Sequence, residues 1–277
     1  MTILVFTLIL LAGAYAAGLL GSLTGLGGGV IVIPLLTLVF HIDFRYAIGA
    51  ALVASIATSS GSASAYVKEG MTNIRLGMFL EIATSIGAVT GAVIALWMPT
   101  NTIAVIFGLV LILTAVMQQR QSADHEHVKG SNLARKLKLF GTYPTKEGNQ
   151  SYELTHVTGG FLTMIVAGIL SGLLGIGSGV LKVLAMDNFM KVPFKVSTTT
   201  SNFMIGVTAV TSAVVYLQRG YIEPGIAFPI MVGVLGGALT GTQLLKRLNV
   251  SLLRKIFAIA ILLVAINMIY NGFAGKF

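Results

Sequence analysis

Long apolar stretches constrain this chain more than any other feature. Runs of 18 or more apolar residues recur along its 277 residues, the mean hydropathy is +0.90, and only 10% of the residues are charged. A soluble domain carries about 25% charged residues. A helix needs about 20 apolar residues to cross a bilayer. The sequence therefore predicts an all-α polytopic membrane protein.

Two of the apolar runs are interrupted by clusters of glycine, at Gly25-Leu26-Gly27-Gly28-Gly29 and at Gly175-Ile176-Gly177-Ser178-Gly179. Glycine weakens a helix by roughly 1 kcal/mol per residue and permits a positive φ, so each cluster predicts a helix that stops and restarts. A restarted helix presents free N–H groups and the positive end of its dipole, which suits an anion. The alternative is that the glycines only let helices pack closely, as small residues do in membranes.

The second half of the chain repeats the first at a shift of 150 residues, without a gap. The matches cluster on glycine, as in the pairs Gly18 and Gly168, and Gly27 and Gly177. We interpret this pattern as an internal duplication with a first transmembrane repeat at 1–118, a basic cytoplasmic connector at 119–154 and a second repeat at 155–277. Many secondary transporters are built from such repeats.

The distribution of basic residues predicts how the repeats are oriented. Cytoplasmic loops of membrane proteins carry an excess of Lys and Arg, which places the connector inside the cell. The basic residues near 246–255 lie on the same side only if residues 155–190 enter the membrane and return as a hairpin. The same hairpin over 2–40 places both termini outside. We therefore expect two inverted repeats, each a Gly-broken helical hairpin followed by three transmembrane helices.

The glycine-rich motifs resemble those of a known family. Gly18-Leu19-Leu20-Gly21 and the stretch from Gly27 to Pro34 are similar to the first signature of the TauE/SafE sulfite exporter family, and residues 175–179 and 198–202 resemble its second-half counterpart. Two departures are Ala51, where many members have Ser, and Ser178, which replaces the middle glycine of the second cluster. The resemblance covers essentially the whole chain and implies a transporter of sulfite or organosulfonates.

We expect the anion to bind between the two glycine clusters. Ten residues are assigned to this site by the backbone breaks, the nearby polar side chains and one cation: Gly27, Gly28, Gly29, Gly177, Ser178, Gly179, Lys182, Thr200, Ser201 and Asn202. Hydroxyl and amide groups of the last three suit sulfonate oxygens. The alternative for these three residues is that they only cap the helix that begins there.

Lys182 and Glu81 are charged side chains inside predicted spans, where a charge is costly and is a functional hypothesis by default. We expect Lys182 to neutralise the anion, with the alternative that it extends to the interface beside Lys191 and Lys195. Glu81 is the candidate carrier of a coupling proton. Its alternatives are an ion pair with Arg75 and a position among the lipid headgroups.

Other classes of function have little support in the sequence. The net charge of +9 comes from loops between spans, which does not indicate nucleic-acid binding. No motif of a hydrolase, zinc protease or Walker-type phosphate loop is present. The tract Asp124-His125-Glu126-His127 is read as solvated, so no metal and no cofactor are expected. A homodimer is left open.

The function that we predict is a secondary transporter exporting small sulfur-containing anions across the plasma membrane, as a multi-pass protein. The alternatives are an anion channel and a transporter of another small organic anion. An enzyme is not expected, because we find no constellation of nucleophile, base or metal ligands.

Overall fold

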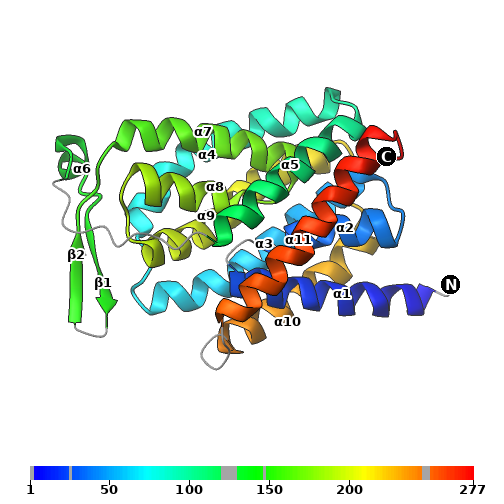
Figure 1. The fold of residues 1–277 in the computed structure, drawn as a ribbon, viewed down its shortest axis with the longest axis horizontal. Coiled ribbons are helices and arrows are strands. Elements are labelled where there is room, and N and C mark those ends of the chain that lie inside the picture. Colours follow the sequence, from blue (N-terminus) through cyan, green and yellow to red (C-terminus); the bar gives the residue numbers. More distant parts are fainter. Residues whose placement is uncertain (1–2, 25–26, 120–129, 146–147, 245–249) are drawn as a thin grey trace.

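The computed structural model describes residues 3–24, 27–119, 130–145, 148–244 and 250–277 (Figure 1). Within these residues, seven helices are long and apolar enough to cross a membrane. They are α1 (Ile3–Thr24), α3 (Phe44–Lys68), α4 (Ile74–Trp97), α5 (Thr100–Gln119), α7 (Val157–Leu174), α9 (Phe194–Gln218) and α10 (Pro224–Leu244). A further long helix, α11 (Val250–Phe273), closes the chain. The predicted class of polytopic α-helical membrane protein is confirmed.

Each half begins with a long helix followed by a short one that folds back along it. The short helices are α2 (Gly29–Pro34), which continues into the π-helical turn η1 (Leu35–Val39), and α8 (Gly179–Leu184), which continues into η2 (Ala185–Phe189). The ring of Phe40 lies 5.1 Å from that of Phe6, and Thr155 N donates to Met190 O at 3.1 Å. In both hairpins the end of the short helical segment therefore lies beside the start of the long helix. The chain turns back at the two glycine clusters.

The two hairpins end in the same backbone conformation at the same 150-residue offset. His41 and Lys191 both have a positive φ, of 52° and 60°. The following amides reach back in the same way, Ile42 N to Leu36 O at 3.0 Å and Val192 N to Met186 O at 2.9 Å. The two halves thus share local structure at positions where the side chains differ.

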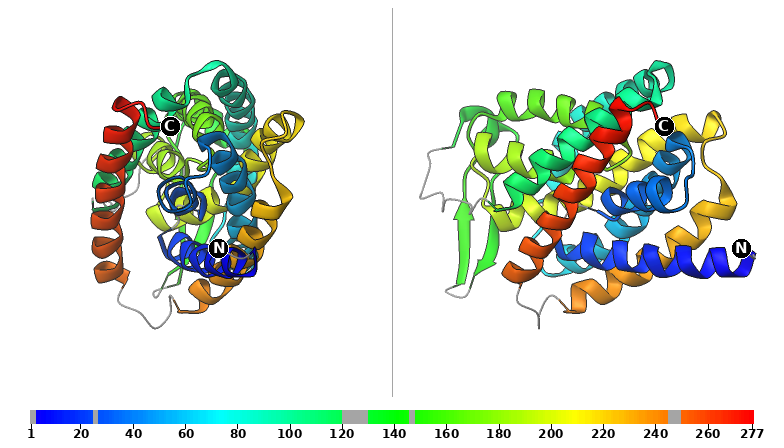
Figure 2. Two further views of the ribbon diagram at one scale, coloured as in Figure 1. Left: turned by 90° about the vertical axis from the view of Figure 1, so that its right-hand side faces the viewer. Right: turned by 45° about the vertical axis from the view of Figure 1, so that its right-hand side comes forward.

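The long helices of each half pack mainly against long helices of the other half. Helix α1 packs mainly on α10, and α7 packs mainly on α4, while α3 lies against α9 and α5 against α11. In Figure 1, α1 begins at one end of the molecule and α7 at the other, so these two helices run in opposite directions. Helices α5 and α11 lie side by side across one face (Figures 1 and 2).

Glycines bring the paired helices into backbone contact. A Cβ on Gly172 of α7 would lie 2.0 Å from Ala88 O, and one on Gly91 of α4 would lie 2.0 Å from Ile169 O. In the other pair, a Cβ on Gly18 of α1 would lie 2.1 Å from Val234 O. Small residues allow this approach, and membrane helices associate largely through such packing. Close packing therefore explains these helical glycines, and the glycines of the two breaks need a separate account.

The connector is folded where the structure describes it. It contains α6 (Asn132–Lys136) and the antiparallel strands β1 (Gly141–Thr145) and β2 (Gly148–Tyr152). Leu139 and Leu154 are buried in a cluster with apolar side chains of α4, α7 and α9. These apolar side chains cover the ends of the membrane helices, so this part of the connector packs against the transmembrane helices. The tract Asp124 to His127 lies outside the described residues.

Asn73 fastens the connector to the start of α4. Its Oδ1 accepts a hydrogen bond from Leu76 N at 3.0 Å, which caps the helix, and its Nδ2 donates to Leu139 O at 2.9 Å and to the Tyr152 hydroxyl at 2.7 Å. Burial raises the pKa of Tyr152 to about 12, so this hydroxyl stays protonated at physiological pH. One side chain therefore serves both the helix and the connector.

Substitution of Asn73 should separate these two roles. Asn73→Ala removes the cap and both donated bonds, and we expect the free energy of unfolding to fall by about 1–2 kcal/mol. Asn73→Asp keeps a capping oxygen but cannot donate, so the connector should loosen while the helix start persists. Trypsin cleavage at Lys136 and Lys138 measures the loosening. Wild-type cleavage rates in both variants would contradict this role.

Candidate functional site

The two glycine breaks meet at one side chain of α9. Gly27 and Gly177 both have left-handed backbone, with φ of 76° and 68°. A Cβ on Gly27 would lie 3.7 Å from Ile205 Cγ2, and one on Gly177 would lie 2.7 Å from the same atom. A Cβ on Gly29 would lie 3.1 Å from Gly175 O. The structure thus brings the two predicted clusters together across Ile205, although they are far apart in the sequence.

The breaks need glycine for two different reasons. Gly27, Gly175 and Gly177 adopt a conformation that side chains disfavour, and Ser178 shares it with φ of 44°. Gly28 instead has a right-handed φ of −68°, and its limit is space, because a Cβ there would lie 2.8 Å from Thr58 Oγ1. The departure at Ser178 is accommodated because its hydroxyl donates to Ala167 O at 2.7 Å.

Two hydroxyl groups of α3 line the first break and were not among the residues assigned from sequence. Gly28 N donates to Thr58 Oγ1 at 3.1 Å. Ser55 Oγ is fully buried, has no hydrogen-bond partner among the described residues, and lies 2.6 Å from the position of a Cβ on Gly29. Ser55 is the repeat mate of Ile205. Polar residues in a predicted span were the available signal, but such residues also join membrane helices.

The three polar residues assigned on α9 have different environments. Thr200 Oγ1 accepts from Asn73 N at 3.1 Å, and Ser201 Oγ donates to Gly179 O at 3.0 Å. Asn202 is 4% exposed, and its Nδ2 has no partner in the part of the chain that the structure describes. Thr200 and Ser201 therefore bond to the backbone of other segments. The capping alternative is wrong, because α9 begins at Phe194 and none of the three residues lies at its start. Asn202 presents a buried donor that nothing else uses.

Lys182 and Glu81 form a buried ion pair. Lys182 is fully buried, and its Nζ lies 3.9 Å from Glu81 Oε2. The Thr208 hydroxyl accepts a hydrogen bond from Lys182 Nζ and donates to Glu81 Oε1 at 2.6 Å. The alternative that Lys182 extends to the interface is wrong. The alternatives for Glu81 are also wrong, since it is 6% exposed, and Arg75 donates to Lys138 O instead.

The ion pair lies close to the two breaks. Thr208, which bridges the pair, lies three residues after Ile205 on α9, a rise of about 4.5 Å along the helix. The repeat mates of Lys182 and Glu81 are Val32 and Met231, so the pair occurs on one side of the repeat only. The region around the two breaks therefore has similar backbone in both halves, but the Lys182–Glu81 ion pair makes its charge asymmetric.

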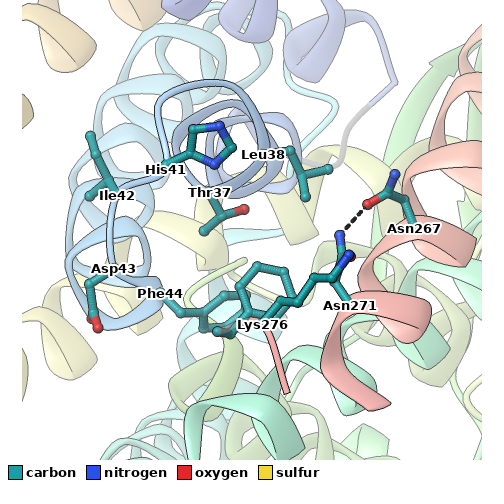
Figure 3. A pocket seen from close by; sticks show the side chains of 10 residues that line it. Thr37, Leu38, His41, Ile42, Asp43, Phe44, Asn267, Asn271 and Lys276 are labelled. Atoms are coloured by element: carbon teal, nitrogen blue, oxygen red, sulfur yellow. Dashed lines mark hydrogen bonds between the residues drawn. The ribbon is translucent and has the colours of Figure 1, made fainter. Parts of the chain in front are cut away.

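A separate cavity of about 460 Å³ lies at the end of the first hairpin (Figure 3). Its lining combines the end of η1, the start of α3 and the end of α11: Thr37, Leu38, His41, Ile42, Asp43, Phe44, Asn267, Asn271, Lys276 and Phe277. Asn271 Nδ2 donates to Asn267 Oδ1 at 2.6 Å in this cavity (Figure 3). None of the ten residues assigned from the sequence lines it. Among the described residues, no group of three His, Asp or Glu side chains is placed to hold a metal ion.

Known proteins resemble this chain over nearly its whole length. The chain is 28% identical to the probable membrane transporter protein YunE of Bacillus subtilis (strain 168), over 92% of this chain and 94% of that protein. It is 24% identical to the probable membrane transporter protein MJ0441 of Methanocaldococcus jannaschii, over 91% of each chain. No solved structure gives a significant match.

The matching family model is described as Sulfite exporter TauE/SafE and covers residues 9–268. This span includes most of the first hairpin, the whole second hairpin, both glycine breaks and the Lys182–Glu81 pair. The relatives and the apolar helices together establish a multi-pass membrane transporter. This chain belongs to the TauE/SafE sulfite exporter family.

Proposed function

We propose that this transporter is a secondary exporter of small sulfur-containing anions, sulfite or short organosulfonates, at the plasma membrane. The observation that carries the proposal is the meeting of two backbone breaks near buried donors that have no partner among the residues that the structure describes. Ser55 Oγ is such a donor next to Gly29, and Asn202 Nδ2 is another, on the residue that follows Ser201, which bonds to Gly179 O. Buried polar groups are normally hydrogen-bonded, so unpaired donors beside a helix break suit an anion with several oxygen acceptors. The family description supports sulfite or a related anion as the substrate.

In this proposal, the anion lies between residues 27–29 and 177–179. The helix that restarts at Gly29 runs without interruption to Val39, and its N-terminal dipole favours a negative charge. Asn202 and Ser55 donate to the anion oxygens, and Lys182, which bonds to Thr208 of α9, supplies the positive charge. Thr200 and Ser201 fix the backbone around the site through the bonds that they already make.

The proposed domain organisation is two inverted repeats, at 1–118 and 155–277, joined by a cytoplasmic connector. A hairpin plus three spans crosses the membrane an odd number of times, so the second repeat starts on the other side. The opposite directions of α1 and α7 support this arrangement (Figure 1). Rocking of one inverted repeat against the other gives alternating access to a site near the midplane.

Single-cysteine labelling tests this topology, since the chain has no native Cys. We expect Phe277→Cys to react with a membrane-impermeant reagent in intact cells. Lys138→Cys, on the connector, should react only after permeabilisation. Labelling of position 277 only after permeabilisation would contradict the inverted arrangement.

Transport measured in liposomes tests the function itself. The purified protein should bind at least one of sulfite, sulfoacetate, sulfolactate, taurine and sulfate. Liposomes loaded with that anion should then show saturable counterflow of the labelled anion. A conductance that does not saturate would identify an anion channel instead. Failure to bind any of these anions would overturn the proposed substrate class.

A further inference from the structure

The buried ion pair between Lys182 and Glu81 has a consequence for how an anion can bind. We propose that the anion takes the place of Glu81 as the partner of Lys182, so that Glu81 takes up one proton for each anion bound. This inference rests on the proposed function. It assigns Lys182, Glu81 and Thr208 as the group that couples anion binding to protonation.

The geometry of the ion pair leaves Lys182 able to bind a substrate anion in place of the Glu81 carboxylate. Lys182 Nζ bonds closely to the Thr208 hydroxyl, but its distance to Glu81 Oε2 is 3.9 Å, beyond hydrogen-bond length. Glu81 Oε2 makes no hydrogen bond within the described residues, whereas Oε1 accepts from Thr208 and from Ser85, the latter at 3.2 Å. The Glu81 carboxylate is therefore held mainly by hydroxyl groups. Because a hydroxyl can both donate and accept a hydrogen bond, the same groups can also bind the protonated carboxyl.

Charge balance makes proton uptake follow from anion binding. With no anion, the buried charges of Lys182 and Glu81 cancel. An anion beside Lys182 would leave a net negative charge in the protein interior if Glu81 stayed ionised, and an unpaired buried charge is costly. A proton from solvent added to a Glu81 oxygen restores neutrality. The proton leaves again when the anion leaves and Lys182 regains its partner.

Few other charged groups can take this role. Helices α5 and α7, which pack near the pair, carry no Asp, Glu, Lys or Arg over Thr100–Gln119 and Val157–Leu174. On α4, Arg75 is exposed and bonded to Lys138 O. On α9, Lys195 is exposed. Among the described residues, Asp187 of η2 is the other buried acid; it is 9% exposed and lies five residues beyond Lys182. Asp187→Asn is therefore an informative comparison with Glu81→Gln.

The exchange fixes the stoichiometry of the transport cycle. One anion and one proton cross together, so a monoanion moves without net charge. Export by this cycle runs only when the outward anion gradient exceeds the inward proton gradient. Anion affinity must also rise as the pH falls, because two coupled ligands strengthen each other's binding by the same factor.

The test uses ethanesulfonate, a small anion that has no group titrating near neutral pH. Purified wild-type protein in lightly buffered detergent should take up about one proton per ethanesulfonate bound. Its affinity should fall about tenfold for each unit of rising pH wherever one proton is taken up per anion bound. Glu81→Gln should bind ethanesulfonate without protonation of a carboxyl group, because the amide at position 81 has no carboxylate to protonate.

Two control variants and a spectroscopic readout sharpen this test. Glu223→Gln removes an exposed carboxylate, and Asp187→Asn removes the other buried one; both should take up protons as the wild type does. Infrared difference spectra of the wild type should show a protonated-carboxyl band when ethanesulfonate is added. This measurement holds even where Glu81→Gln does not fold.

Three results would overturn the exchange: wild-type binding without proton uptake, a protonated-carboxyl band that persists in Glu81→Gln, or uptake lost in Asp187→Asn. The first of these leaves an anion transporter with some other coupling, so the proposed function stands. If neither ethanesulfonate nor any anion of the screen binds, the proposed function fails and the exchange fails with it.

Discussion

Replacement of Gly172 by valine is expected to prevent accumulation of the folded protein, while Gly159→Val on the same helix leaves it unchanged. A Cβ on Gly172 would lie 2.0 Å from Ala88 O, an atom of the α4 backbone, whereas a Cβ on Gly159 meets nothing within 4 Å. A backbone oxygen cannot move aside as a side chain can, so α4 and α7 must separate. Overpacking costs about 1–3 kcal/mol and more where relief is blocked, and we expect about 3 kcal/mol or more here.

Fluorescence-detected gel filtration and thermal unfolding in detergent measure this effect. The two substitutions add the same side chain to α7, so membrane insertion and helix propensity are matched. A melting temperature of Gly172→Val equal to that of Gly159→Val would contradict the close approach of α4 and α7. Gly18 is not a suitable control, because a Cβ there would lie 2.1 Å from Val234 O.

Lys182→Met is expected to weaken anion binding at least about thirtyfold. Truncating one side of a desolvated charged contact costs about 2 kcal/mol or more, and 1.4 kcal/mol corresponds to a factor of ten. Lys195→Met, which removes an exposed lysine from the start of α9, should bind as the wild type does. Equilibrium binding of sulfite or ethanesulfonate to the purified variants gives the ratio.

The buried partner must be considered in the same experiment. Lys182→Met leaves Glu81 buried without its cation, and breaking such a pair destabilises a protein more than replacing both residues. The double variant Lys182→Met/Glu81→Gln should therefore fold better than Lys182→Met and still fail to bind. An unchanged dissociation constant in either variant would remove Lys182 from the site.

The backbone architecture was predictable because it depends on patterns that a single sequence contains. Apolar length predicts spans, and four glycines in five residues predict a helix that breaks. The two hairpins follow from these patterns together with the placement of basic residues. What one sequence cannot separate is the role of each glycine. Gly172 and Gly177 lie five residues apart. Gly172 allows close contact with the backbone of α4, whereas Gly177 adopts a left-handed backbone conformation.

The polar contacts were harder to predict because they join residues distant in the sequence. Lys182 and Glu81 were both recognised as charges inside spans, but Arg75 is much nearer to Glu81 along the chain and was the simpler partner. Only the packing of α8, α4 and α9 around Thr208 brings the two together. Ser55 was passed over for a similar reason, since its proximity to Gly29 depends on how α2 folds back against α3.

The most direct test of anion binding at the glycine breaks is anomalous X-ray diffraction from crystals grown with 2-bromoethanesulfonate. The bromine marks the position of the anion without reference to any side chain. We predict one strong peak between residues 27–29 and 177–179, in contact with Ile205 and Asn202. A peak in the cavity beside His41, Asn267 and Lys276 (Figure 3), with none at the breaks, would contradict the assignment of the transport site.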